Sequence, residues 1–283
     1  MIQAIKQARA ALGMLSAEEV RRRASAVYTF GLVADNERAY QEMEAFLIPP
    51  GAPPAERARL RSLVYRADSP DVPAKVDFVL YQDGAAGPEG TYVFHSARPE
   101  RTASEIAHRN EEAALALARA YPSFRGPVVE RIIHATAFEN LLFSVATALP
   151  DVIPNLIELP WAFGEFASDT AFLTANQVRM AFQIAGACGK EPGFSHQRAE
   201  IAGIAAGAFG WRAIARELAS KIPFGGGLAP KGAMAYAVTY GIGMGLARLY
   251  QARAPYTKAE RRRIYEQAYQ RGRELSDPSG PGQ

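Results

Sequence analysis

The spacing of hydrophobic and polar residues divides the chain into a mixed N-terminal half and a helical C-terminal half. Short runs rich in β-branched and aromatic residues between turn residues are typical of strands. They occur at AVYTFGLVA (26–34), RSLVYRA (61–67), KVDFVLYQ (75–82) and TYVFHS (91–96). Between the first two, ERAYQEMEAFLI (37–48) has helical spacing, and Asp35 or Asn36 can cap it. Residues 25–122 are therefore predicted to form a small α/β layer.

From Phe124 onward the spacing of apolar residues is that of helices. Capping boxes and prolines predict where individual helices begin. These start signals are Thr102 with Glu105, Pro127, Thr174 with Gln177, and Thr257 with Glu260. The first of these helices is expected to run to Tyr121, and the third is expected to end near Gly189. Ser16 with Glu19 gives one more capping box, before SAEEVRRRA.

The predicted fold class is α+β, with a small degenerate α/β layer of the nucleotide-binding kind followed by a mostly α-helical domain. The predicted organisation has four parts: an amphipathic helix (1–24), the small α/β domain (25–122), the helical domain (123–275) and a disordered tail (276–283).

Composition and charge exclude several classes of protein. The chain has 283 residues, of which 48% are hydrophobic and 22% charged, as in ordinary globular proteins. A net charge of +3 is too small for the basic surface of a nucleic-acid-binding protein, so no nucleic-acid partner is expected. Cys188 is the single cysteine, which rules out an internal disulfide and fits a reducing compartment. No signal peptide is predicted at the N-terminus, so the expected location is the cytoplasm.

The segment KGAMAYAVTYGIGMGLARLY (231–250) has small residues every four positions. Each glycine inside a helix costs about 1 kcal/mol relative to alanine, and close approach of another helix commonly offsets this cost. The preceding helix has glycines of matching spacing, so the two helices are predicted to contact each other through small faces. The predicted packing residues are Gly203, Gly207, Ala237, Gly241 and Gly245. The uncharged stretch is short for a bilayer, so a buried core helix and shallow membrane insertion remain the alternatives.

No catalytic, metal or cofactor site is predicted. Lys231 lies between Pro230 and Gly232, which does not fit a phosphate-binding P-loop. The Glu105–His108 spacing of a di-iron helix lacks the second motif that such a site requires. The polar residues Gln177, Arg179, Glu200 and Arg212 lie near apolar helix faces and form either an internal polar network or a recognition site.

The helical half resembles the YcjF-like domain family, a bacterial family of unknown function. The resemblance covers about residues 124–250 and is carried by FRGPVVERIIHATAFENLLFSVATALPDVIP, FLTANQVRMAFQIAGACG and GFSHQRAEIAGIAAGAFGWRAIARELASKIPFGGGLAPKGAMAYAVTYGIGMGLARLY. Members often follow, or are encoded beside, Era-like GTPase domains. The resemblance implies membrane association through the apolar helices and no established catalytic residues. This chain departs from the family because residues 25–122 lack the glycines and the Lys-Ser/Thr pair that hold a nucleotide.

Two functions are therefore expected as alternatives. The first is a non-enzymatic, membrane-proximal scaffold or regulator that binds a partner protein, either a GTPase or a membrane protein. The basic helix TKAERRRIYEQAYQRGREL (257–275) would then hold it peripherally on the inner face of an anionic membrane. Its opposite face has an apolar stripe that includes Ile264, Tyr265, Ala268, Tyr269 and Leu275. The second is a soluble small-ligand binder or enzyme with a site between the α/β layer and the helices.

Overall fold

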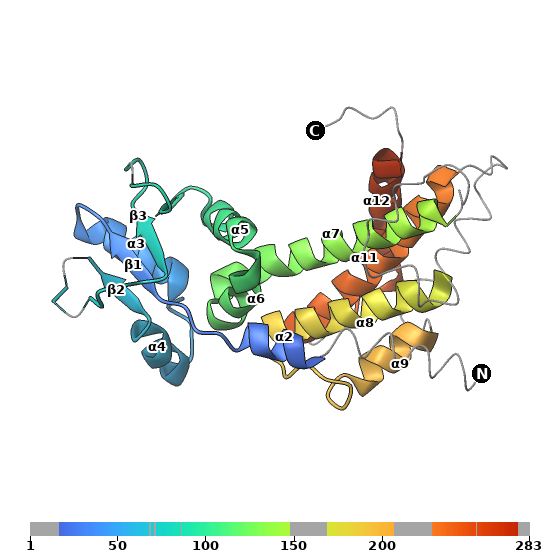
Figure 1. The fold of residues 1–283 in the computed structure, drawn as a ribbon, viewed down its shortest axis with the longest axis horizontal. Coiled ribbons are helices and arrows are strands. Elements are labelled where there is room, and N and C mark those ends of the chain that lie inside the picture. Colours follow the sequence, from blue (N-terminus) through green and yellow to red (C-terminus); the bar gives the residue numbers. More distant parts are fainter. Residues whose placement is uncertain are drawn as a thin grey trace. The chain divides into compact units, whose positions relative to one another are not determined.

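The aromatic and β-branched runs of the N-terminal half form a four-stranded sheet in a computed structural model of the chain (Figure 1). The model describes residues 17–67, 69–70, 72–85, 87–147, 169–206, 228–252 and 254–276. The strands are β1 (Phe30–Val33), β2 (Val64–Arg66), β3 (Phe78–Tyr81) and β4 (Tyr92–Val93). They pair in parallel in the order β2-β1-β3-β4. This small parallel sheet, followed by a largely helical region, confirms the predicted fold class.

The N-terminal half of the sequence also contains the helices that precede, connect and follow these strands. They are α2 (Ala17–Ala24), α3 (Glu37–Leu47), α4 (Pro54–Arg61), α5 (Pro99–Arg109) and α6 (Glu111–Ala120). The side chain of Asn36 accepts a hydrogen bond from the backbone N–H of Ala39 and so caps α3. This confirms one of the two caps that the sequence allowed.

The C-terminal half contains the described helices α7 (Pro122–Ala146), α8 (Asp169–Ala187), α9 (Arg198–Ala206), α11 (Leu228–Ala252) and α12 (Lys258–Ser276). α12 begins at the predicted capping box. The Thr257 backbone N–H donates to Glu260 Oε2 at 2.8 Å, and the Glu260 N–H donates to Thr257 Oγ1 at 3.3 Å. Gly189 has a positive φ of 74° just beyond the end of α8, which confirms the predicted stop.

The chain separates into two compact units. One, here called the α/β unit, comprises Val20–Glu130 with Gly186–Glu191. The other, the helical unit, comprises Met1–Glu19, Arg131–Ala185 and Pro192–Gln283. Within the described residues, no helix has both the length and the apolar character that a membrane span needs.

Three predicted helix starts are wrong. α5 begins at Pro99, and the Thr102 hydroxyl accepts from the backbone N–H of His95 at 2.8 Å instead of capping a helix. The helix predicted to run to Tyr121 is also broken at Asn110, whose amide donates to the Tyr92 hydroxyl and to the Ile106 carbonyl. In both cases a proline or a tertiary contact overrides a local capping pattern.

The other two errors lie in α7 and α8. α7 begins at Pro122, so Pro127 lies inside the helix and removes one main-chain hydrogen bond. α8 begins at Asp169, which places Thr174 and Gln177 in its interior. The Gln177 side chain is therefore free to reach another helix. The predicted capping box at Ser16 and the predicted tail lie outside the described residues, except for Ser276 at the end of α12.

Candidate functional site

The carboxyl edge of the sheet is the place where parallel α/β sheets commonly bind ligands. The chain leaves β1 toward β2 on one side and leaves β3 toward β4 on the other, so the switch point lies between β1 and β3. Asp35 follows β1 and Gln82 follows β3. The Asp35 backbone N–H donates to Gln82 Oε1 at 2.8 Å, and Gln82 Nε2 donates to Asp35 Oδ2 at 2.7 Å. The Asp35 carboxylate and the Gln82 amide therefore use hydrogen-bonding groups on each other at the switch point.

α3 is the helix that follows β1 in the chain, so its N-terminus comes after the carboxyl end of that strand. This N-terminus is acidic. Glu37 lies in its first turn and forms a bidentate ion pair with Arg66, with distances of 2.7 and 3.0 Å. Hydrogen bonds from Arg66, and then from Gln41, hold the pKa of the Glu37 carboxyl below its ordinary value. A second carboxylate, Glu44, accepts from Arg66 Nε at 2.6 Å. A negative first turn disfavours a phosphate at this helix terminus.

A further set of polar residues follows β3 and β4. The backbone N–H and hydroxyl of Ser96 both donate to Asp83 Oδ2, and these bonds hold the pKa of Asp83 below its ordinary value. Glu105 Oε2 lies 3.7 Å from His95 Nε2, and Glu105 Oε1 lies 3.2 Å from Arg109 Nη2. Over the residues that the structure describes, no three His, Cys, Asp or Glu side chains lie close enough together to hold a metal ion.

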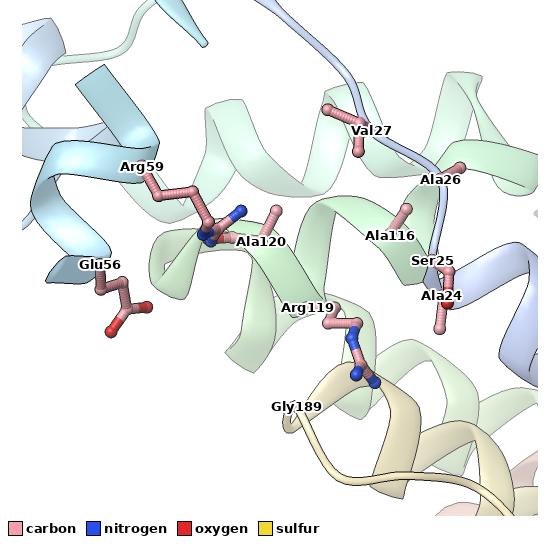
Figure 2. Close-up of a pocket in the computed structure, with 10 residues that line it drawn as sticks. All are labelled: Ala24, Ser25, Ala26, Val27, Glu56, Arg59, Ala116, Arg119, Ala120 and Gly189. Carbon is pink, nitrogen blue, oxygen red and sulfur yellow. The ribbon is translucent and has the colours of Figure 1, made fainter. Parts of the chain in front are cut away.

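A pocket of about 500 Å³ lies elsewhere in the α/β unit (Figure 2). The segment after α2, the helices α4 and α6, and the loop after α8 supply its lining. Alanines and Gly189 form much of the wall, and the charged lining residues are Glu56, Arg59 and Arg119. The Arg59 side chain extends from α4 toward Ala120, and Arg119 extends from α6 toward Gly189 (Figure 2). The pocket therefore combines a wall of small side chains with two guanidinium groups.

The two arginines of the pocket differ in their partners. Arg119 donates to the backbone carbonyl of Lys190 at 2.9 Å and lies 3.9 Å from Glu191, which also pairs with Arg21. Arg59 donates to the Ala120 carbonyl at 3.2 Å and makes no ion pair with any described residue. A carbonyl neutralises no charge, and a guanidinium has five N–H donors. Arg59 thus keeps its charge and most of its donors for another acceptor.

A second pocket, of about 550 Å³, lies beside α3 and β4. Its wall includes Phe46 and Phe94, whose ring centroids are 5.4 Å apart. The cation at this pocket, Arg38, is already paired with Glu42 at 2.9 Å. The pocket beside Arg59 is therefore the better candidate for an anionic ligand.

The helical unit contains a buried polar cluster. Asn140 Nδ2 donates to Thr239 Oγ1 at 2.8 Å, Asn176 Nδ2 donates to Asn140 Oδ1 at 2.9 Å, and Gln177 Nε2 donates to Thr239 Oγ1 at 3.2 Å. We call these four residues the amide cluster; each is at most 4% exposed. Gln177 Oε1 is buried and accepts no hydrogen bond from the described residues. Hydrogen bonds of this kind fix the register of α7, α8 and α11.

Of the four residues predicted for an internal polar network, one is found in the amide cluster. Gln177 belongs to the amide cluster, whereas Arg179 pairs with Glu139 of α7. Glu200 lies half-buried in the first turn of α9, outside that cluster, and Arg212 lies outside the described residues. Sequence reasoning missed Asn140, Asn176 and Thr239. The only available signal was that each is a polar residue in an otherwise apolar helical stretch.

Next to the amide cluster, His134 Nδ1 and the Tyr236 hydroxyl lie 2.6 Å apart. Burial raises the pKa of Tyr236 to about 12. The phenol therefore stays protonated at neutral pH and can act as the donor in this contact.

The predicted contact between two helices through small residues stays a prediction, because most of the first of these helices lies outside the described residues. Ala237 and Gly241 are buried, Gly203 and Gly245 are half-buried, and Gly207 lies outside the described residues. Over the described residues, close contacts are shown at other glycines of α11 and α12. A Cβ on Gly243 would lie 2.7 Å from Ile133 of α7, and one on Gly272 would lie 2.9 Å from the Ala233 Cα of α11. α11 therefore packs closely against α7 and α12.

α12 packs on α11 through one face, and its other face is exposed. Tyr265, Ala268 and Gly272 are buried in that contact, and Ile264 and Tyr269 are half-buried. Of the predicted apolar stripe only Leu275 is exposed. The exposed cations of α12 are Lys258, Arg262, Arg263, Arg271 and Arg273, and its exposed carboxylates are Glu266 and Glu274.

Comparison with known proteins gives no relative: no family model, no curated protein and no solved structure matches the chain.

Proposed function

We propose that the protein is a non-enzymatic scaffold or regulator that lies against an anionic membrane and binds a protein partner. The observation that carries the proposal is the outward basic face of α12. Arg262 and Arg271 pair with Glu266 and Glu274 on the same helix. Lys258, Arg263 and Arg273 are exposed and form no ion pair with any described residue, so they can meet lipid phosphates.

The contact would be electrostatic and would not involve insertion of α12. The apolar side of this helix is already occupied by α11, so its aromatic residues do not offer a surface to lipid. Each basic residue near an anionic leaflet contributes about 1 kcal/mol, and three such residues change the affinity roughly a hundredfold. The interaction should accordingly weaken with salt, because the Debye length shortens to about 8 Å at physiological ionic strength.

The carboxyl edge of the sheet supports the non-enzymatic part of the proposal. The residues that would face a bound nucleotide, Asp35 and Gln82, bond to each other, and the first turn of α3 carries Glu37. The connection from β1 to α3 consists of Ala34, Asp35 and Asn36, without glycine to cradle a phosphate. A sheet of this kind is suited to present side chains and edges to a partner protein.

Co-sedimentation with vesicles of rising phosphatidylglycerol content tests the membrane proposal. The wild-type protein should bind in proportion to anionic lipid at low salt and should dissociate as salt is added. Replacement of Lys258, Arg263 and Arg273 together by serine should abolish most of this binding. The control replaces Arg22, Arg38 and Arg61, three exposed arginines of the α/β unit, and lowers the net charge equally. Equal loss in both triple variants, or no binding by the wild type, would rule out a membrane contact through α12.

A second candidate function, binding of a small anionic ligand, is favoured by the pocket beside Arg59. Its volume of about 500 Å³ is enough for such a molecule. Thermal-shift measurements with citrate and with inorganic phosphate test this alternative, with Arg59→Gln as the control. A shift that requires Arg59 would support ligand binding, and the absence of any shift would count against it.

A further inference from the structure

We propose that the pocket beside Arg59, with the irregular segment (25–27) after α2, binds an acidic, extended peptide segment of a partner protein. The inference rests on the proposed partner binding and names the surface and the chemistry of the partner. It concerns the α/β unit alone, so its test is separate from the vesicle experiment on α12.

The first argument is the charge of the pocket. Among the described residues, the Arg59 guanidinium donates to a single, neutral partner, the Ala120 carbonyl, and Arg119 shares one carboxylate, Glu191, with Arg21. Among the described residues that line the pocket, Glu56 is the only carboxylate. A glutamate or aspartate side chain of a partner could accept charge-assisted hydrogen bonds from Arg59, which are about twice as strong as neutral ones.

The second argument is the backbone beside the pocket. Ala26 and Val27 lie between the end of α2 and the start of β1, outside any helix or strand. Their N–H and C=O groups make no hydrogen bond with the described residues, and both residues are exposed. An extended peptide can pair with such a segment in the same way as a strand is added to a sheet edge.

The third argument is the shape of the wall. Val27 is 65% exposed, which is unusual for a large apolar side chain, and it lines the pocket with Ala116 and Ala120. In an extended peptide, alternate side chains point to the same side. Two peptide residues that are two positions apart can therefore both point at this wall. One would be acidic and contact Arg59, and the other would be aliphatic and contact Val27 and the alanines.

The experiment uses the full-length protein and a fluorescein-labelled peptide of alternating glutamate and valine, followed by fluorescence anisotropy. Peptides of equal length with glutamine or lysine in place of glutamate test the charge. A glutamate–valine peptide that is N-methylated at alternate residues tests the backbone pairing. The proposal expects binding of the acidic peptide and a loss of at least about tenfold for each of the three altered peptides.

Three substitutions test the location. Arg59→Gln should weaken binding about tenfold, because it removes the charged donor and keeps a polar side chain. Glu56→Gln should strengthen binding several-fold, because it removes the carboxylate that opposes the ligand. Arg61→Gln is the matched control: it lies on the same helix, is exposed and does not line the pocket, so it should change the affinity less than about twofold.

The proposal is overturned if Arg59→Gln and Arg61→Gln weaken binding equally, since the attraction would then be general electrostatics. It is also overturned if the acidic peptide does not bind, or if the N-methylated peptide binds as well as its parent. Full displacement of the peptide by millimolar inorganic phosphate would assign the pocket to a phosphate ligand and would equally contradict a peptide site. Arg59 and Arg61 are exposed and Glu56 is half-buried, so the folding of all three variants is checked by circular dichroism before binding is measured.

Discussion

The two units of the molecule build their cores from different interactions. In the α/β unit the core is aromatic: the Phe30 ring lies 5.0 to 5.9 Å from the rings of Phe78, Tyr121 and Phe124. In the helical unit, helices approach closely at glycines and share the buried amide cluster. Aromatic packing contributes mainly through the large apolar area that it buries, whereas buried hydrogen bonds also depend on every partner being in place. The units should therefore respond differently to small and large substitutions.

The largest effect is expected in the aromatic core. Phe30→Ala removes a ring that is 0% exposed and contacts three others, so it should lower the free energy of unfolding of the α/β unit by about 3–5 kcal/mol. Urea denaturation combined with hydrogen exchange measures the loss and assigns it to a unit. The matched control is Phe138→Ala, since Phe138 is 39% exposed in α7 and its removal should cost far less. Equal costs for the two variants would refute an aromatic core centred on Phe30.

The amide cluster should be sensitive to a change that alters almost no volume. Thr239→Val removes the hydroxyl that accepts from both Asn140 and Gln177 and leaves two buried amides without an acceptor. The expected loss is at least about 2 kcal/mol, because each of the two unsatisfied buried amides costs about 1–3 kcal/mol. The control is Thr136→Val, at a buried threonine of α7 outside the cluster. If thermal unfolding shows the two variants to be equally stable, the cluster does not stabilise the helical unit.

Adding one methyl group, by a glycine-to-alanine substitution, should have different effects on stability at Gly272 and at Gly126. Gly272→Ala places a Cβ 2.9 Å from the Cα and 3.1 Å from the carbonyl oxygen of Ala233, which are backbone atoms and cannot rotate away. Although alanine favours a helix, we expect a loss of about 1–3 kcal/mol from forcing α12 away from α11. Gly126→Ala in α7 meets nothing within 4 Å outside its chain neighbours, and because Pro127 disfavours a Cβ on the helical residue before it, the gain of about 1 kcal/mol in helix propensity should be largely offset. Equal urea midpoints for the two variants would contradict the close contact of α11 and α12.

The comparison also explains which features could be predicted from the sequence. Strands and the caps at Asn36 and Thr257 depend on neighbouring residues, so local patterns located them. The failed starts at Thr102, Pro127 and Thr174 had the right residue types, but prolines upstream or partners in distant helices decided the outcome.

The candidate sites were less predictable, because they depend on which helices meet. Nothing local distinguishes Thr239 or Asn140 from a solvated polar residue, and the close contacts of Gly243 and Gly272 require the positions of neighbouring helices. The pocket beside Arg59 likewise combines residues from α4, α6 and the segment after α2, which are far apart in sequence.

The smallest expected effect concerns how helices of the two units are capped. α3 is capped by the neutral amide of Asn36, whereas the cap of α12 pairs Thr257 with the ionisable carboxyl of Glu260. Hydrogen bonds from the Thr257 backbone and then from its hydroxyl hold the pKa of Glu260 below its ordinary value. A carboxyl with a lowered folded-state pKa contributes stability that is complete above its unfolded pKa and is lost as the pH falls through the folded pKa.

Thr257→Ala removes the hydroxyl and should return the Glu260 pKa part of the way toward its ordinary value. The stability difference between wild type and variant should therefore be largest at neutral pH and should shrink in acid. A residual difference should persist, because the hydrogen bond from the Glu260 N–H to the Thr257 hydroxyl, which does not titrate, is also lost. An NMR titration of the Glu260 carboxyl, with urea unfolding at neutral and acid pH, measures both quantities. An unchanged Glu260 pKa in the variant would mean that the backbone N–H of Thr257 alone sets it, and the acid sensitivity of α12 would then be independent of the hydroxyl.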